Sequence, residues 1–225
     1  MVAPSPTAPM SVQVDVVSDV VCPWCYIGKH RLEAAIALVP DVEVAINWRP
    51  YFLNPWIPRE GIDRQTYLET KFGSAERYAA IAERVAAAAA IEGLTYAPDK
   101  ISRQPNTIDC HRVILWSRSA GEPARMKQRL MELYFAEGAD LSDPRVLINA
   151  AADCGMDGEL VRRLLATDAD VERIEGEASG AKEAGIDGVP CFIFAGSVIV
   201  TGAQSPEYLA NAIERSASRH TQLRA

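Results

Sequence analysis

The stretch Ser18-Asp-Val-Val-Cys-Pro-Trp-Cys-Tyr-Ile-Gly28 decides the fold, because it joins a strand pattern to a helix pattern through two cysteines. Before it, valines alternate with other residues at Val12, Val14 and Val16, which predicts a strand. After it, apolar residues recur with the helical spacing i, i+3, i+4 and i+7, at Leu32, Ala35, Ile36 and Val39. The pattern predicts a helix that starts around the two cysteines and ends at Pro40-Asp41.

A second alternating run follows this helix directly. Its apolar positions are Val42, Val44, Ile46 and Trp48. A strand, a helix and a strand in such close succession form a βαβ unit, whose two strands are parallel and whose crossover is right-handed. We therefore expect residues 11–58 to build the N-terminal half of an α/β fold.

The middle of the chain has a different character. Residues 59–168 show almost no β-branched alternation, and good helix formers dominate. This composition predicts an insertion without a strand of its own, made of helices at 64–72, 74–92, 106–120, 123–137, 144–154 and 157–166. Asp143 followed by Pro144 is typical of an N-cap with proline at the first helical position.

The mixed pattern returns in residues 169–220, which we expect to form the C-terminal half of the fold. A helix over 169–184 leads to Gly188-Val-Pro190, and two short apolar runs joined by a glycine turn predict a hairpin at 191–194 and 198–200. A final helix starts at Ser205-Pro206. The predicted order is βαβ, a helical insertion, and then αββα.

Composition and charge exclude several classes of protein. Hydrophobic residues make up 48% and charged residues 24% of the chain, which indicates a packed core. A net charge of −7 without a lysine and arginine cluster argues against nucleic-acid binding, and the longest apolar run, Val85–Ile91, is too short to cross a membrane. Residues 1–10 contain three prolines and no secretory-signal pattern, so we expect a disordered leader and a cytoplasmic protein.

Cys22 and Cys25 are the only closely spaced pair among five cysteines. In the first turn of a helix two such cysteines lie on one side and can close a disulfide ring. Free N–H groups and the helix dipole favour a thiolate at Cys22, because such placement lowers a cysteine pKa from about 8.5 to about 3.5–7.5. Cys25, one turn further in, is expected to be the more buried, resolving thiol. The pair could instead be half of a zinc site or two unreactive core cysteines, but no second pair has the spacing that would complete a zinc site.

Several segments together resemble the DsbA family of thiol–disulfide oxidoreductases, and within it the FrnE-like cytoplasmic branch. They are residues 18–28, Trp48-Arg-Pro-Tyr-Phe-Leu-Asn-Pro55, Asn106-Thr-Ile-Asp-Cys-His-Arg112, Gly188-Val-Pro190 and Thr201-Gly-Ala-Gln204. The same elements are similar to 2-hydroxychromene-2-carboxylate isomerases and kappa-class glutathione transferases. The resemblance covers roughly residues 12–215 and implies a thioredoxin fold with a large all-helical insertion.

The resemblance also implies roles for single residues. Cys22 is the attacking thiolate, Cys25 the resolving thiol, and Pro190 a cis-proline beside the disulfide. Substrate contacts are implied for Pro23, Trp24, Val189, Asn106 and His111, with the backbone of Val189 pairing with an extended substrate like an added strand. The implied partners are protein or small-molecule thiols and disulfides. No metal or bound cofactor is required, and glutathione is a candidate redox partner or cosubstrate.

The chain departs from the family pattern at particular positions. Thioredoxins commonly carry a buried acid where this chain has Val16, so the proton of Cys25 must move through water or another group. Trp24 stands where DsbA has histidine, so the redox potential does not carry over. Cys191 can be a small buried strand residue or a third redox thiol, and His111 can be a structural residue or an acid–base group.

The leading functional prediction is thiol–disulfide exchange at the Cys22-Pro-Trp-Cys25 motif. One alternative is a glutathione-dependent isomerase or transferase, although such relatives typically have serine at the position of Cys22. Another is a redox-sensing or chaperone-like binding module that has no catalytic turnover.

Overall fold

The computed structural model of the chain describes residues 10–222. Its central sheet has four strands in the order β2-β1-β5-β6, which are β2 (Val42–Pro50), β1 (Met10–Ser18), β5 (Cys191–Phe194) and β6 (Val198–Thr201). Strands β1 and β2 are parallel, while β5 pairs antiparallel with β1, and β6 antiparallel with β5. The predicted βαβ unit and C-terminal hairpin thus share one mixed sheet, and the α/β fold class is confirmed.

Helices cover both faces of this sheet. On one face α1 (Pro23–Ala37) and α9 (Pro206–Gln222) pack against each other, and α9 also contacts β1. On the other face α8 (Val171–Glu183) packs against β2. Successive side chains of a strand point to opposite faces, so Val16 of β1 joins the main core while Val17 joins a separate cluster that includes Ala181 of α8.

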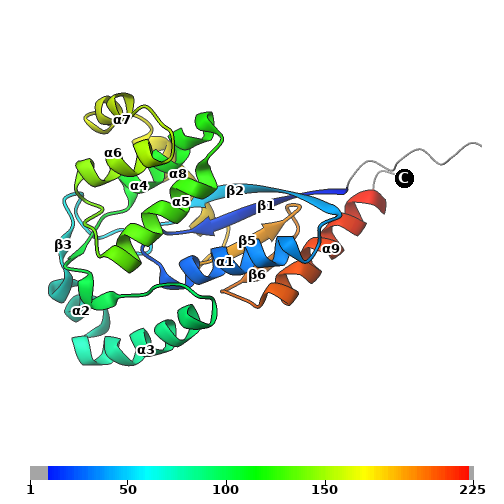
Figure 1. The fold of residues 1–225 in the computed structure, drawn as a ribbon, viewed down its shortest axis with the longest axis horizontal. Helices are drawn as coiled ribbons and strands as arrows, with labels where there is room; N and C mark the ends of the chain where they lie inside the picture. Colours follow the sequence, from blue (N-terminus) through cyan, green and yellow to red (C-terminus); the bar gives the residue numbers. More distant parts are fainter. Residues whose placement is uncertain (1–9, 223–225) are drawn as a thin grey trace, which may run out of the picture.

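The insertion gathers at the end of the sheet toward which β1 points (Figure 1). It contains α2 (Arg64–Phe72), α3 (Ala75–Ile91), α4 (Ile108–Trp116), α5 (Pro123–Glu132), α6 (Pro144–Asp153) and α7 (Gly158–Leu165). Short 3-10 helices span Pro98–Lys100 and Ser117–Ala120, and α5 continues as a π-helical turn over Leu133–Glu137. The predicted cap before α6 is present, because the Asp143 carboxylate accepts a hydrogen bond from the Arg145 backbone N–H at 2.9 Å.

The prediction that the insertion has no strand of its own was wrong. Strands β3 (Ile62–Asp63) and β4 (Arg103–Gln104) pair antiparallel within it. Two residues per strand are too few to show an alternating pattern in sequence. The pair is held by contacts between segments distant in the chain, including the Arg103 side chain, which donates to the carbonyl of Glu60.

The predicted leader needs a smaller correction. Met10, its last residue, is the first residue of β1, where it pairs with Val42, and residues 1–9 lie outside the described part of the chain. Helix α4 begins at Ile108 rather than at Asn106, because the Asn106 side chain accepts a hydrogen bond from the Ile108 N–H at 3.0 Å. The division into two halves and an insertion, with limits at 58 and 168, stays a prediction.

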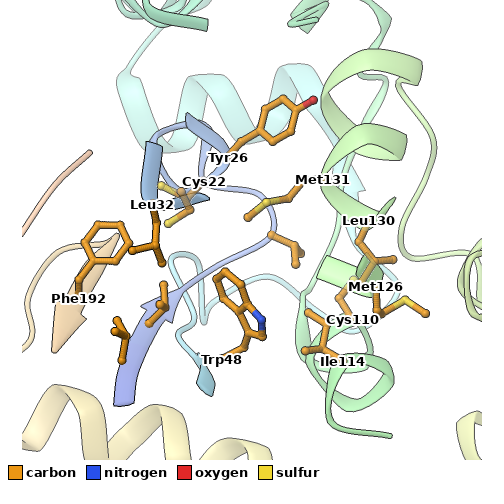
Figure 2. Close-up of a cluster of buried hydrophobic side chains, with 14 of the residues drawn as sticks. Cys22, Tyr26, Leu32, Trp48, Cys110, Ile114, Met126, Leu130, Met131 and Phe192 are labelled. Atoms are coloured by element: carbon orange, nitrogen blue, oxygen red, sulfur yellow. The ribbon is translucent and has the colours of Figure 1, made fainter. Parts of the chain in front are cut away.

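One large apolar core joins the sheet, α1 and the insertion (Figure 2). Cys22 and Cys25 belong to it, as do Trp48 of β2 and Met131 of α5. Burying a side chain the size of valine or leucine stabilises a fold by about 1.5–3 kcal/mol. The two cysteines are therefore held by the packing of the whole molecule and not by one flexible loop.

Gly28 sits where α1 approaches Pro190 most closely. A Cβ atom at this position would lie 2.8 Å from Pro190 Cγ and 3.3 Å from Phe192 Cζ. We predict that Gly28→Ala destabilises the protein by about 1–3 kcal/mol, because overpacking must push the Pro190 loop or α1 aside. This cost should exceed the gain of about 1 kcal/mol that alanine brings within a helix. Urea unfolding measures the difference.

Gly176→Ala is the matched control. Gly176 also lies inside a helix, α8, but a Cβ atom there meets nothing within 4 Å. This substitution should stabilise the protein by about 0.5–1 kcal/mol. Equal stabilisation by both substitutions would show that α1 and the Pro190 loop are not closely packed.

Candidate active site

Cys22 occupies the N-cap of α1, and Pro23 is the first residue of the helix. The carbonyl of Cys22 accepts hydrogen bonds from the N–H groups of Cys25 at 3.0 Å and Tyr26 at 3.2 Å, which closes the first helical turn. Proline at this position costs no hydrogen bond, since an N–H group there would have had no partner in the helix. Both cysteines are unbonded thiols, and their exposed fractions are only 4% and 2%.

The loop before β5 lies against Cys22. The Val189–Pro190 peptide bond is cis, in agreement with what the resemblance implies. The Sγ of Cys22 lies 3.6 Å from the carbonyl oxygen of Val189, to which the thiol donates a hydrogen bond. A thiolate has no proton to donate, so ionisation of Cys22 frees this carbonyl for a different donor.

The two thiols differ in acidity. The pKa of Cys22 is lowered chiefly by a hydrogen bond from the Cys25 thiol, with help from backbone N–H groups and against the effect of burial. Burial raises the pKa of Cys25 well above its ordinary value. These directions make Cys22 the more acidic of the two thiols. Trp24, between them, is 37% exposed at the surface.

Asp19 is a member of the site that the sequence analysis missed. It is fully buried, and its Oδ2 accepts a hydrogen bond from the N–H of Leu53 at 2.9 Å. Burial alone would raise the pKa of Asp19, but the nearby His111 and these hydrogen bonds lower it, so the group remains a carboxylate. Its negative charge opposes ionisation of Cys22. A single acid in the apolar run before Cys22 was the available signal in the sequence.

His111 lies beside this carboxylate. Its Nε2 is 3.4 Å from Asp19 Oδ1, but the angles do not make a hydrogen bond. The ring is 4% exposed, and burial lowers the pKa of His111 despite the adjacent Asp19. His111 is therefore a buried neighbour of Asp19, and the predicted substrate contact at this residue stays a prediction.

The Asn106 side chain joins two segments of backbone by hydrogen bonds. Its side-chain amide donates to the carbonyl of Ile57 at 2.7 Å and its oxygen accepts from Ile108. It also lines a cavity of about 300 Å³ together with Phe52, Asn54 and Lys182. A role of Asn106 in substrate binding stays a prediction.

Lys127 is a second missed member of the site. It lies on α5, is 1% exposed, and has its Nζ 5.5 Å from the centre of the Trp48 ring. Burial lowers the pKa of Lys127 to about 8, against the negative charges of Cys25 and Asp19. In sequence it is one of many polar residues of this helix, and only its spacing of three and four from Leu130 and Met131 indicated burial.

Lys71 brings a further cation to the site from α2. Its Nζ donates to the Asn54 side chain at 2.5 Å. Burial lowers the pKa of Lys71, and the negative charges of Cys22 and Asp19 oppose this shift. Two elements of the insertion, α2 and α5, thus supply positive charge to the cysteine pair.

Of the remaining cysteines, Cys110 and Cys154 lie in the same core cluster as Cys22 and Cys25, whereas Cys191 lies outside it. Cys191 is 1% exposed and clusters with Val17 and Tyr51 rather than with the Cys22 core. Burial raises the pKa of Cys191, and it raises that of Cys110 strongly. Both therefore have the surroundings of buried, protonated side chains, and the packing favours the interpretation of Cys191 as a strand residue.

Within residues 10–222 no group of three or more histidine, cysteine, aspartate or glutamate side chains is arranged to hold a metal ion. No helix in this range has both the length and the apolar content needed to span a bilayer.

Comparison with known proteins identifies the family. Residues 13–214 match the DSBA-like thioredoxin domain, and the chain belongs to this family. The chain is 26% identical over 206 residues to the uncharacterised protein YwbO of Bacillus subtilis (strain 168), covering 91% of this chain and 96% of YwbO. The structure of a probable DsbA oxidoreductase, SCO1869 of Streptomyces coelicolor, superposes with a TM-score of 0.81 at 30% identity, covering 91% and 89% of the two chains.

More distant structures share the fold. A 2-hydroxychromene-2-carboxylate isomerase has a TM-score of 0.67 at 16% identity, covering 94% of this chain and 98% of its own. The cytosolic disulfide reductase DsbM of Pseudomonas aeruginosa has a TM-score of 0.62 at 19% identity with the same coverage. DsbM has also been solved with glutathione, with a TM-score of 0.59 at 18% identity, covering 95% of this chain and all of DsbM. The predicted family is confirmed, and the predicted likeness to the isomerase holds at the level of the fold.

The charge of Asp19 should control the acidity of Cys22. We predict that Asp19→Asn lowers the pKa of Cys22 further, because it removes a negative charge that opposes the thiolate while keeping an acceptor for the Leu53 N–H. The ultraviolet absorbance of the thiolate, followed against pH, measures this shift. Asp15→Asn is the control, since Asp15 bonds to Asn47 on the sheet and should leave the titration unchanged. An upward shift for Asp19→Asn would contradict the assignment.

Proposed function

We propose that this protein is a thiol–disulfide oxidoreductase in which Cys22 attacks and Cys25 resolves. The observation that carries the proposal is the placement of two unbonded thiols at the start of α1, with Cys22 at the N-cap and its Sγ 3.6 Å from the Val189 carbonyl oxygen. The pKa directions, lowered for Cys22 and raised for Cys25, agree with these roles. The family and the SCO1869 likeness support the same class of reaction.

The reaction proceeds in two exchanges. The Cys22 thiolate attacks one sulfur of a substrate disulfide and forms a mixed disulfide, and the other substrate sulfur leaves as a thiolate. Cys25 then loses its proton and attacks Cys22, so a Cys22–Cys25 disulfide forms and the second substrate thiolate leaves. The enzyme gives up two electrons and the substrate accepts them, and the reverse sequence oxidises a dithiol.

The loop of Val189 and Pro190 is the proposed docking edge for substrate. The Val189 carbonyl oxygen accepts a hydrogen bond from the Cys22 thiol, with 3.6 Å between oxygen and Sγ. When that thiol ionises, the carbonyl becomes free to accept a hydrogen bond from a substrate. An extended peptide could then pair with this backbone while its disulfide faces Cys22. Pro23 and Trp24 lie between the two cysteines, and the exposed Trp24 ring offers an apolar contact to the same substrate.

We propose glutathione as a redox partner of the protein and the cytoplasm as its location. DsbM, a cytosolic disulfide reductase with the same fold, has been solved with glutathione. The half-buried Lys71 and the buried Lys127 act electrostatically on the cysteines and suit a thiolate-forming site. No metal or organic cofactor takes part in the proposed exchange.

A second candidate function follows from the isomerase likeness. The fold shared with 2-hydroxychromene-2-carboxylate isomerase favours a glutathione-dependent isomerase or transferase, in which Cys22 would hold glutathione and form no disulfide with Cys25. A redox-sensing or chaperone-like module is the third possibility. It would bind partners at the same edge without turnover.

Equilibration in glutathione buffers, followed by alkylation and intact mass, separates these functions. The proposed oxidoreductase should lose about 2 Da reversibly, mapped to Cys22 and Cys25. The isomerase or transferase should instead gain about 305 Da as a glutathione adduct and form no internal disulfide. A protein that shows neither change would contradict both functions and leave the binding module.

Substitution of single cysteines assigns the roles. We predict that Cys22→Ser reduces disulfide exchange to the uncatalysed background, because a hydroxyl does not ionise near neutral pH. Cys25→Ser should instead trap mixed disulfides that persist on a non-reducing gel. Cys191→Ala is the control, since Cys191 packs in a different cluster and should leave exchange unchanged. Full activity of Cys22→Ser would show that another thiol attacks.

A further inference from the structure

Helix α3 has two apolar faces, one in the core and one that lines an open groove. On the first face Val85 and Ala89 are buried in a cluster with Ile27 of α1. The second face carries alanine at positions 75, 79, 82 and 86, whose spacing of 4, 3 and 4 keeps them on one side of the helix. These alanines are exposed or half-buried, and the groove beside them has a volume of about 800 Å³.

The groove lies between α3, the start of α2 and the segment 98–102. Leu68 of α2, together with Pro98 and Ile101, completes its apolar lining. Figure 1 shows α3 at the outer edge of the molecule. The stretch of α3 from 75 to 86 is about 16 Å long at 1.5 Å per residue. An elongated ligand such as a helix therefore fits the groove better than a compact molecule does.

Three carboxylates line this groove, each from a different element. Asp63 precedes α2, Glu83 belongs to α3, and Asp99 lies in the 3-10 helix that follows α3. All three residues are exposed. Within residues 10–222 none of them forms a salt bridge. The groove thus combines an apolar floor with negative charge that the described chain does not neutralise, and its complement is an apolar surface bordered by basic side chains.

Arg64 is the one cation among the described residues that line the groove, and its guanidinium is already bonded to the protein. Its Nη1 donates to Gln104 Oε1 at 2.6 Å, and its Nη2 donates to the Tyr78 hydroxyl at 3.0 Å. Its Cζ also lies 5.1 Å from the ring centres of both Tyr67 and Tyr78. Because Arg64 is held in this way, the three carboxylates set the charge that a ligand meets.

We propose that the groove between α2 and α3 is a docking site for a basic amphipathic helix of a partner protein. The apolar side of that helix lies on the alanine face of α3, where small side chains allow two helices to approach closely. Its lysine or arginine side chains pair with Asp63, Glu83 and Asp99. Helix-in-groove recognition of this kind uses apolar anchors spaced i, i+3, i+4 and i+7. Docking here goes beyond the proposed exchange reaction and does not require it.

Two matched peptides test the chemistry of the partner. Each has about 14 residues, or about 21 Å as a helix, with leucine repeated at the spacing i, i+3, i+4 and i+7. They differ only in carrying lysine or glutamate at every other position. We predict that the lysine peptide binds about tenfold more tightly at low salt, as measured by fluorescence anisotropy. Added salt should reduce this difference, because it screens exposed charges.

Neutralising the three carboxylates tests their part in binding. The combined variant Asp63→Asn, Glu83→Gln and Asp99→Asn should bind the lysine peptide about tenfold more weakly, because it loses three exposed ion pairs. Asparagine at 63 can still accept the Thr66 N–H that Asp63 accepts at 3.0 Å, so the start of α2 is kept.

A second combined variant controls for net charge. Glu43→Gln, Glu172→Gln and Glu214→Gln remove the same charge from exposed residues that do not line the groove. This variant should bind the lysine peptide within about twofold of the unmodified protein, since exposed charges outside the contact are screened by salt.

Filling the groove tests the position of the contact. We predict that Ala79→Trp weakens binding of the lysine peptide about tenfold or more, because the indole occupies the space beside α3. Ala87→Trp is the matched control, since Ala87 is also exposed on α3 but does not line the groove. Neither change replaces a buried side chain, so both variants should fold, and only Ala79→Trp should lose binding.

Three results would overturn the docking site. They are equal binding of the two peptides, equal weakening by the two charge variants, and normal binding by Ala79→Trp. Sedimentation velocity tests a second copy of the chain as the occupant. A dimer of the unmodified protein that Ala79→Trp breaks would show that the groove is a contact between copies, and would overturn the basic partner.

Discussion

The close packing of α1 on the loop of Val189 and Pro190 is the constraint on which the rest of the site depends. It brings the first turn of a helix from one end of the chain against a loop from the other end, with the Cys22 sulfur 3.6 Å from the Val189 carbonyl. There is room for this approach only because residue 28 is glycine. The start of the helix, the Cys22 thiol and the backbone that we propose binds substrate thus meet at one point, which no local segment could achieve alone.

Near that contact lies a set of ionisable groups that the insertion completes. Asp19 comes from the sheet side, whereas Lys71, His111 and Lys127 come from α2, α4 and α5. Burial works against every charged form, so each group shifts toward its neutral state unless a neighbour opposes the shift. The acidity of the two cysteines is therefore a property of the assembled domain. The insertion contributes directly to the chemistry and is more than a cover over the sheet.

Much of the fold could be read from local patterns. The alternation of valines in β1, the helical spacing after Cys25 and the Asp143–Pro144 cap each depend on neighbours a few residues away, and the structure agrees with all three. The short strand pair β3 and β4 could not be predicted, because two residues cannot show an alternating pattern and the paired strands lie about forty residues apart in the chain. Lys127 was missed for a related reason, since lysine in a polar helix usually faces water.

The sequence by itself determined the order of the elements of the central sheet, the thioredoxin-fold family and the cysteine pair. Residue spacing and short motifs are enough to specify those features. Only the tertiary structure decided which buried groups surround that pair. Burial and charge pairing arise from contacts between residues far apart in the chain, as between Asp19 and His111. A pKa depends on those contacts rather than on residue type, and the relative acidity of the two cysteines therefore had to come from the folded molecule.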